Sequence, residues 1–256
     1  MARIVKYVFY DLLRTRFILL YTVLLLVSTI VLFQFDSDPG KIILSLLNVV
    51  LMVVPLVSIV FTTIHFFNSY EFIELMLAQP VNRTVIFLSE FIALALSLCL
   101  AYLIGVGIPM VAYGATTTGG PTLLFTGLML TLVFISLAFL ASVLTRDKAK
   151  AIGLALLFWF YFSLIYDGIL LWVIFSFSDY PIEKLTLGLV ALNPVDLARI
   201  IMLLKLDISA LMGYTGAFYK NFFGSNQGVI FSTAVLFIWI AFPLALAARI
   251  FAKKDL

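Results

Sequence analysis

The chain has 256 residues, of which 64% are apolar and only 11% are charged, with a net charge of +3. Soluble domains are about half apolar and about a quarter charged, because charged side chains must cover their surface. This composition therefore excludes an ordinary soluble protein and a disordered chain, and it predicts an integral membrane protein.

Residues 1–16 predict an amphipathic helix that lies on the membrane surface ahead of the first span. Ile4, Val8 and Leu12 recur every fourth residue and form an apolar stripe, whereas charged side chains such as Lys6 fall on the other face. A cleaved signal peptide is the alternative for such a basic start. No A-x-A cleavage site follows, which favours a retained helix.

Six apolar segments follow, and each is long enough to cross about 30 Å of hydrocarbon as a helix. They cover residues 17–35, 42–67, 85–113, 122–144, 151–177 and 229–251. The long connection over 178–228 has mixed polarity. The predicted fold class is an all-α integral membrane protein, a single domain over 1–256 with six transmembrane helices, an N-terminal interfacial helix and short outer helices between spans five and six.

Six spans place both chain ends on the same side of the membrane, and the basic residues indicate which side. Eleven of the sixteen Lys and Arg residues fall on the side of the chain ends, in short loops close to the spans. The positive-inside rule therefore predicts cytoplasmic termini. It also places residues 68–84 and 146–150 in the cytoplasm and the 178–228 region outside.

The sequence carries no signature of an enzyme. A nucleotide-binding P-loop needs G-x-x-x-x-G-K-[ST], but the only Gly-Lys pair, Gly40-Lys41, is followed by Ile42, and no G-x-S-x-G elbow is present. One cysteine and one histidine exclude an internal disulfide, a multi-Cys zinc site and an H-E-x-x-H site. We therefore expect no catalytic residue, no metal site and no cofactor in the chain itself.

The polar segment 68–84 is the most informative loop. It is compatible with a helix up to Gln79, where Pro80 disfavours continuation. Glu71 and Glu74 stand among apolar residues. A short amphipathic helix of this kind can insert into a groove on a soluble partner, and the alternative is a solvated loop between two spans.

This segment resembles the cytoplasmic coupling region of type-two ABC transporter permeases, which carries an E-x-x-x-x-L-L-A-x-P-x-x-R pattern after the second span. The matching residues are Glu71, Leu77, Ala78, Pro80, Val81 and Arg83, with looser spacing. The resemblance implies a membrane subunit that works as a homodimer in the bacterial inner membrane. Each copy would dock through 68–84 and 146–150 onto a separate cytoplasmic ATPase, which binds ATP and Mg²⁺.

A second marker is the L-N-P-x-D-x-x-R run that ends at Arg199. Asn193-Pro194 is a turn signal after which a helix can restart, and Asp196 can form an ion pair with Arg199 at i+3. The run resembles permeases of nitrous oxide reductase maturation, which implies a periplasmic partner that handles copper or sulfur. A structural turn, a docking surface for that partner and direct substrate contact stay open.

Ionisable residues inside spans are costly and therefore mark candidate functional positions. Asp167, beside Tyr166, is a candidate for the translocation path or the dimer seam; alternatively the span ends early, in a broken turn with Gly168. Glu90 in the third span is a weaker candidate that can also reach the headgroups. His65 is expected to be a hydrogen-bonded interface residue.

An ATPase-independent six-span channel or secondary carrier is the alternative function. Carriers commonly repeat their two halves, with paired broken helices or charges at the midplane. We find no such repeat, and Asp167 has no counterpart in the first three spans. The sequence therefore favours the ABC permease.

Overall fold

The computed structural model describes residues 1–36, 38–78, 82–115, 119–177, 183–205 and 226–253, and every regular element in these ranges is helical. Six helical stretches are long and apolar enough to cross a membrane. They are Arg16–Phe35 (α2), Pro39–Asn68 (α3), Arg83–Ala112 (α5, η1 and α6), Gly120–Leu144 (α7), Lys148–Ser176 (α8, η2 and α9) and Gly228–Lys253 within α13 (Asn226–Lys253). The predicted fold class and the six spans are confirmed.

Aspartates fix the start of two of these helices. Asp38 accepts a hydrogen bond from the Gly40 N–H at 2.9 Å ahead of α3, and Asp147 accepts one from the Ala149 N–H at 3.2 Å ahead of α8. Each carboxylate satisfies a backbone donor that has no partner within its own helix. The apolar runs beyond these caps form helices, because a helix satisfies its backbone hydrogen bonds internally where no water is available inside a bilayer.

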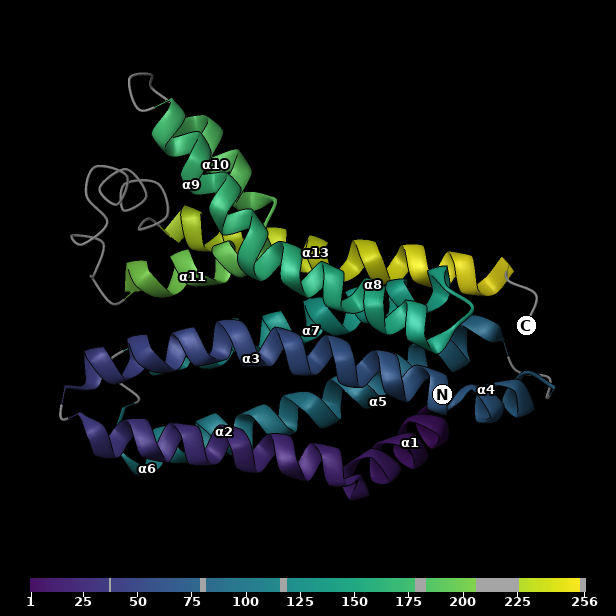
Figure 1. The fold of residues 1–256 in the computed structure, drawn as a ribbon. Coiled ribbons are helices and arrows are strands. Elements are labelled where there is room, and N and C mark those ends of the chain that lie inside the picture. Colours follow the sequence, from purple (N-terminus) through teal and green to yellow (C-terminus); the bar gives the residue numbers. More distant parts are fainter. Residues whose placement is uncertain (37, 79–81, 116–118, 178–182, 206–225, 254–256) are drawn as a thin grey trace.

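The N-terminal segment forms a helix of its own, α1 (Ala2–Arg14), which meets α2 at an angle (Figure 1). Thr15 separates the two helices with an extended backbone (ψ 133°). Val8 and Leu12 are buried, and α1 packs against α5 (Arg83–Tyr102). The predicted apolar stripe therefore faces the bundle, and the position of α1 on the membrane surface stays a prediction.

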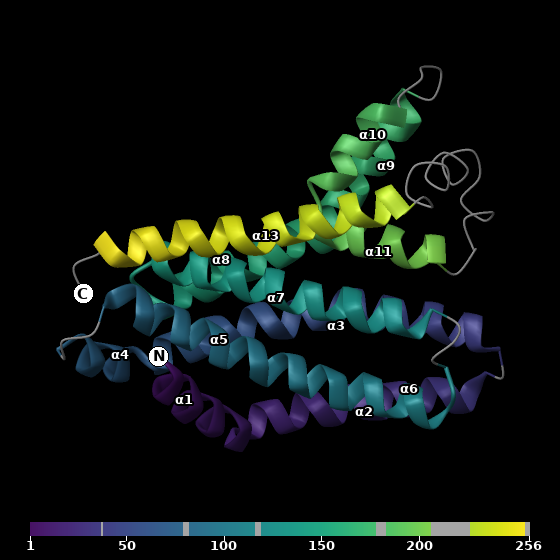
Figure 2. The same ribbon diagram turned by 180° about the vertical axis from the view of Figure 1, so that it is seen from behind.

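Helix α7 is the centre of the bundle and packs against α3, α5, α8 and α13. Helices α1 and α2 lie on the α5 side, whereas α8 (Lys148–Phe160) and α13 lie on the other side (Figures 1 and 2). One close approach needs a glycine: a Cβ on Gly127 of α7 would overlap the phenol of Tyr102. The Tyr102 hydroxyl is buried there and donates to the Leu123 carbonyl at 3.0 Å. Small residues admit such close contacts between membrane helices.

The fifth candidate span changes direction before it ends. Its last part, α9 (Tyr166–Ser176), leaves the bundle together with α10 (Glu183–Ala191), as both views show. Helix α11 (Pro194–Lys205) then returns and packs against α7 and α13. Short helices therefore stand between spans five and six, as the sequence predicts.

The two ends of the bundle differ in what they carry. The start of α1, the helix α4 (Tyr70–Leu77), the 146–150 loop and the end of α13 lie together at one end, which we call the terminal end (Figure 1). The end of α2, the start of α3 and α11 lie toward the other end, which we call the distal end. Candidate functional residues gather in both places.

Candidate functional site

The predicted coupling segment forms the amphipathic helix α4, followed by Ala78 as its C-terminal cap. Gln79 and Pro80 lie outside the described residues. The apolar face of α4 packs on the bundle: Ile73 is 2% exposed, and the Phe72 ring stacks on Tyr7 of α1 with centroids 5.7 Å apart. This face holds α4 against the body of the protein.

The other face of α4 is exposed and acidic. Glu71 and Glu74 are exposed, and Leu75 has 69% of its surface accessible. Leu77 is half-buried, and Arg83 is exposed at the start of α5. The helix therefore presents two carboxylates and one large apolar side chain outward from the terminal end, and its other apolar residues inward.

The segment that we call the 146–150 loop, which includes the first turn of α8, lies next to α4. Lys148 Nζ donates to Asn68 Oδ1 at 2.7 Å, which ties the loop to the end of α3. The pKa of Tyr70 is raised above its usual value, mainly by burial and also by the Glu74 carboxylate. The positive charge of Arg146 lowers it and so acts in the opposite direction. The two segments that the sequence assigns to one partner are thus neighbours in space.

A buried polar cluster lies beneath the junction of α3 and α4. Glu90 is 2% exposed, and its Oε2 lies 3.3 Å from His65 Nε2. Ser69 Oγ lies 3.2 Å from the same nitrogen, and Ser69 is both the last cap of α3 and the first cap of α4. Glu90 therefore points into the bundle rather than to the headgroups. It is connected through His65 to Ser69, the residue between α3 and α4, which we call the Ser69 hinge.

Four phenylalanines join the helix ends next to this cluster. The ring centroid of Phe87 in α5 lies 5.0 Å from those of Phe139 in α7 and Phe251 in α13. The ring centroid of Phe66 in α3 lies 5.5 Å from that of Phe139. Edge-to-face aromatic pairs add to the free energy gained by burial alone. Four spans are therefore held together at the level where α4 attaches.

The distal candidates form a second cluster. Arg199 Nη1 of α11 donates to Asp167 Oδ2 of α9 at 2.8 Å and to Asp196 Oδ1 at 3.0 Å. Asp167 and Arg199 keep about a third of their side-chain surface accessible, whereas Asp196 keeps 5%. The ion pair suggested by the i+3 spacing is present, and Asp167 extends it to the fifth span.

The L-N-P run positions this cluster by capping α11. Asn193 Oδ1 accepts from the Val195 N–H at 3.0 Å, with Pro194 as the first helical residue. Asn193 Nδ2 donates to Asp196 Oδ2 at 2.8 Å and to the Phe162 carbonyl at 2.9 Å. The cap therefore also fastens α11 to the fifth span.

A π-helical turn makes the Phe162 carbonyl available. In η2 (Tyr161–Ile165) the Tyr166 N–H donates to the Tyr161 carbonyl, one residue further back than in an α-helix. The helix then continues through Asp167, so this carboxylate does not lie in a broken turn. The Tyr166 hydroxyl donates to the Leu189 carbonyl at 2.6 Å and joins α9 to α10.

Asp196 is the titratable group of this cluster outside the candidate spans. The pKa of Asp196 is raised to about 7, and the largest cause is burial. A hydrogen bond with Asp167 and the negative charge of that carboxylate also raise it. Arg199 and Asn193 act in the opposite direction. Two carboxylates share one guanidinium here, so a proton is bound more readily than at an ordinary aspartate.

The structure regroups the residues that the sequence singled out. Asp167 and Tyr166, taken as path or seam candidates, lie in one cluster with the proposed partner residues Asn193, Asp196 and Arg199. Glu90 lies apart from them, beneath α4. Within the described ranges no three His, Cys, Asp or Glu side chains gather in a way that could hold a metal ion.

Sequence reasoning missed the contacts between distant segments. The His65–Glu90 pair joins residues 25 positions apart, and Lys148 reaches Asn68 over 80 positions. The available signal was that both members of the first pair are ionisable and lie near the same end of adjacent spans. No local pattern indicates the π-helical turn or the phenylalanine contacts.

Comparison with known proteins gives one family and two relatives. Residues 49–256 match a family model described as ABC-2 family transporter protein. A probable ABC transporter permease protein NosY from Pseudomonas aeruginosa is 31% identical over 193 residues, which cover 71% of this chain and 68% of the relative. A protein of the same name from Stutzerimonas stutzeri is 30% identical over 193 residues, covering 70% and 67%.

Proposed function

Because the chain belongs to the ABC-2 family, whose permeases are non-catalytic membrane subunits that pair with ATPase subunits, we propose that its ATPase docks at the terminal end on α4 and the 146–150 loop. The observation that carries the proposal is that these two segments adjoin: Lys148 donates to Asn68, two residues before α4 begins, and the charge of Arg146 acts on Tyr70, the first residue of α4. The exposed face with Glu71, Glu74 and Leu75 is complementary to a groove on the ATPase that is lined by basic and apolar side chains.

Force on α4 would reach the spans by two routes. One is the Ser69 hinge, which is linked through His65 to Glu90 of α5. The other is the stack of Phe72 on Tyr7, which leads into α1 and from there to α5. The phenylalanine contacts between the span ends would make the bundle respond as a unit, because close-packed interiors transmit strain.

Two copies of the chain would form the transporter, each with one ATPase, in a bacterial inner membrane. The distribution of Lys and Arg predicts cytoplasmic termini, and the acidic face of α4 would then lie on the side where ATP is available. The ATPase would bind ATP and Mg²⁺, and this chain would supply the path or the mechanical link. Membership of the ABC-2 family favours this reading over an ATPase-independent channel or carrier.

A more specific role is maturation of nitrous oxide reductase, with export or handling of copper or sulfur at a periplasmic partner. The two relatives named NosY support this proposal at about 30% identity. The distal cluster of Asp167, Asp196 and Arg199 would then lie on the partner's side of the membrane. Its charged groups suit either a protein contact or a step in opening the path.

The experiment is co-purification of the tagged full chain with its ATPase from the native host. The double variant Glu71→Lys with Glu74→Lys should lose the ATPase, while Asp11→Lys, a matched change of an exposed acidic residue on α1, should retain it. An ATPase that stays bound to the double variant would refute docking at α4. Transport by vesicles that contain the chain but no ATPase would refute the whole proposal.

A further inference from the structure

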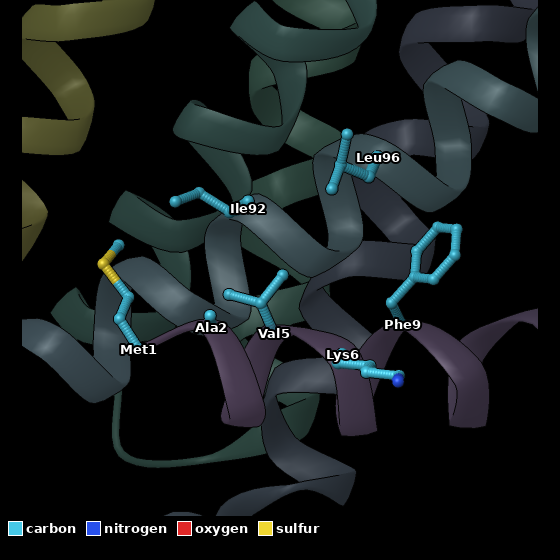
Figure 3. A pocket seen from close by; sticks show the side chains of 7 residues that line it. All are labelled: Met1, Ala2, Val5, Lys6, Phe9, Ile92 and Leu96. Carbon is cyan, nitrogen blue, oxygen red and sulfur yellow. The ribbon is translucent and has the colours of Figure 1, made fainter.

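A groove between α1 and α5 is not used by the coupling proposal. It has a volume of about 490 Å³, and apolar side chains line it: Ala2, Val5 and Phe9 from α1, and Ile92 and Leu96 from α5. Figure 3 shows Val5 and Phe9 rising from α1 toward Ile92 and Leu96, with the Lys6 ammonium to one side. The volume is within the range of about 300–1,000 Å³ that holds small organic ligands.

The groove opens to the surroundings rather than into the core. Leu96 is 51% exposed and belongs to the candidate span Arg83–Ala112, so in a single chain within the membrane its outer surface would be open to hydrocarbon. Tyr7 and Tyr10 of α1 are 65% and 55% exposed. Exposed tyrosines of this kind collect at the level of the lipid headgroups. The groove thus extends from the headgroup region toward the acyl chains.

Charge at the rim of the groove indicates which lipid suits it. Lys6 is the charged residue among the side chains that line the groove, and it is exposed. A lysine at this depth can extend its ammonium to the interface while its aliphatic part covers apolar surface. A cation beside an acyl-sized apolar groove is complementary to a lipid with an anionic headgroup.

We propose that the groove binds one acyl chain of an anionic phospholipid, whose phosphate pairs with Lys6. The bound chain fills the space between α1 and α5 and fixes α1 against the third span. Tyr7 of the same helix stacks on Phe72 of α4, so lipid in the groove also stabilises the attachment of α4. Lipid binding itself does not depend on the ATPase proposal, and only the effect on α4 rests on it.

The test uses the full chain in nanodiscs made of equal amounts of phosphatidylethanolamine and phosphatidylglycerol, one of which carries a photoactivatable diazirine in an acyl chain. Cross-linked residues are located by mass spectrometry. We expect phosphatidylglycerol to label α1 and the Ile92–Leu96 turn preferentially. Lys6→Gln should lower this labelling about fivefold, which corresponds to about 1 kcal/mol, and should leave labelling by phosphatidylethanolamine unchanged.

Matched variants separate the groove from general contact with lipid. Arg3→Gln removes an exposed cation of α1 that does not line the groove, and it should leave the labelling unchanged. Leu96→Trp should fill the groove and abolish labelling there, whereas Ile108→Trp, at an exposed position in the same span, should not. Circular dichroism and gel filtration identify variants that have not folded.

Three results would overturn the proposal. They are labelling spread evenly over the exposed faces of all spans, equal labelling of the groove by the two lipids, and an unchanged pattern in both Lys6→Gln and Leu96→Trp. ATPase binding that persists when the groove is blocked would reject only the link to α4. An unaltered chain that shows the labelling but does not bind the ATPase would instead reject docking.

Discussion

The pair formed by His65 and Glu90 allows a quantitative test of the terminal end. Replacing His65 by leucine leaves the carboxyl group of Glu90, which is 2% exposed, without its hydrogen-bond partner. Removing one partner of a buried ion pair costs about 3–5 kcal/mol, and leaving a neutral polar group unpaired costs about 1–3 kcal/mol. The 3.3 Å separation is long and His65 is 11% exposed, so we expect a loss of about 2–3 kcal/mol for His65→Leu.

The double variant distinguishes this reasoning from simple loss of packing. His65→Leu with Glu90→Leu removes both polar groups, and replacing both partners by apolar side chains is nearly neutral in many proteins. The double variant should therefore be more stable than His65→Leu alone. Glu90→Leu alone should have a small effect, because His65 keeps its contact with Ser69.

Thermal unfolding of the purified chain in one detergent measures these differences. A loss of 2–3 kcal/mol corresponds to a fall in Tm of roughly 5–10 °C for a chain of this size. Additive effects of the two substitutions would refute a coupled pair. So would a double variant less stable than His65→Leu. Either result would also weaken the route by which we propose that movement of α4 reaches α5.

Three further predictions concern packing, protonation and transport. Gly127→Ala should lower Tm because the new methyl group overlaps the phenol of Tyr102. Gly153→Ala should not, because a Cβ added there meets no atom of another segment within 4 Å; equal Tm values for the two variants would contradict the packing. The pKa of Asp196 is raised in the folded chain to about 7, so stability should fall as pH rises toward and through 7, and Asp196→Asn should flatten that dependence in pH-resolved melting curves. Asp167→Asn should impair transport in vesicles without loss of expression, because Arg199 loses one of its two carboxylates; full transport would remove Asp167 from the path.

Much of the candidate site could be predicted from local sequence, but the way its parts combine could not. The helical nature of α4 followed from residues close together in the chain, as did the helix start at Pro194 and the ion pair between Asp196 and Arg199. Asp167 joins that pair from 32 positions away, across a π-helical turn that no motif announces. Its contact depends on where α11 returns to the bundle. This is a property of packing, which a single sequence does not encode in any short pattern.

The sequence by itself determined that the chain lies in a lipid bilayer, how many spans it has and approximately where they end. These follow from the free energy of moving apolar and charged groups between water and hydrocarbon, which is nearly additive along the chain. Only the tertiary structure decided which costly polar groups share a site: Glu90 with His65 beneath α4, and Asp167 with Arg199 near the distal end. A buried charge is tolerated only with a partner at hydrogen-bond distance, and that partner is fixed by the packing of helices that are distant in sequence.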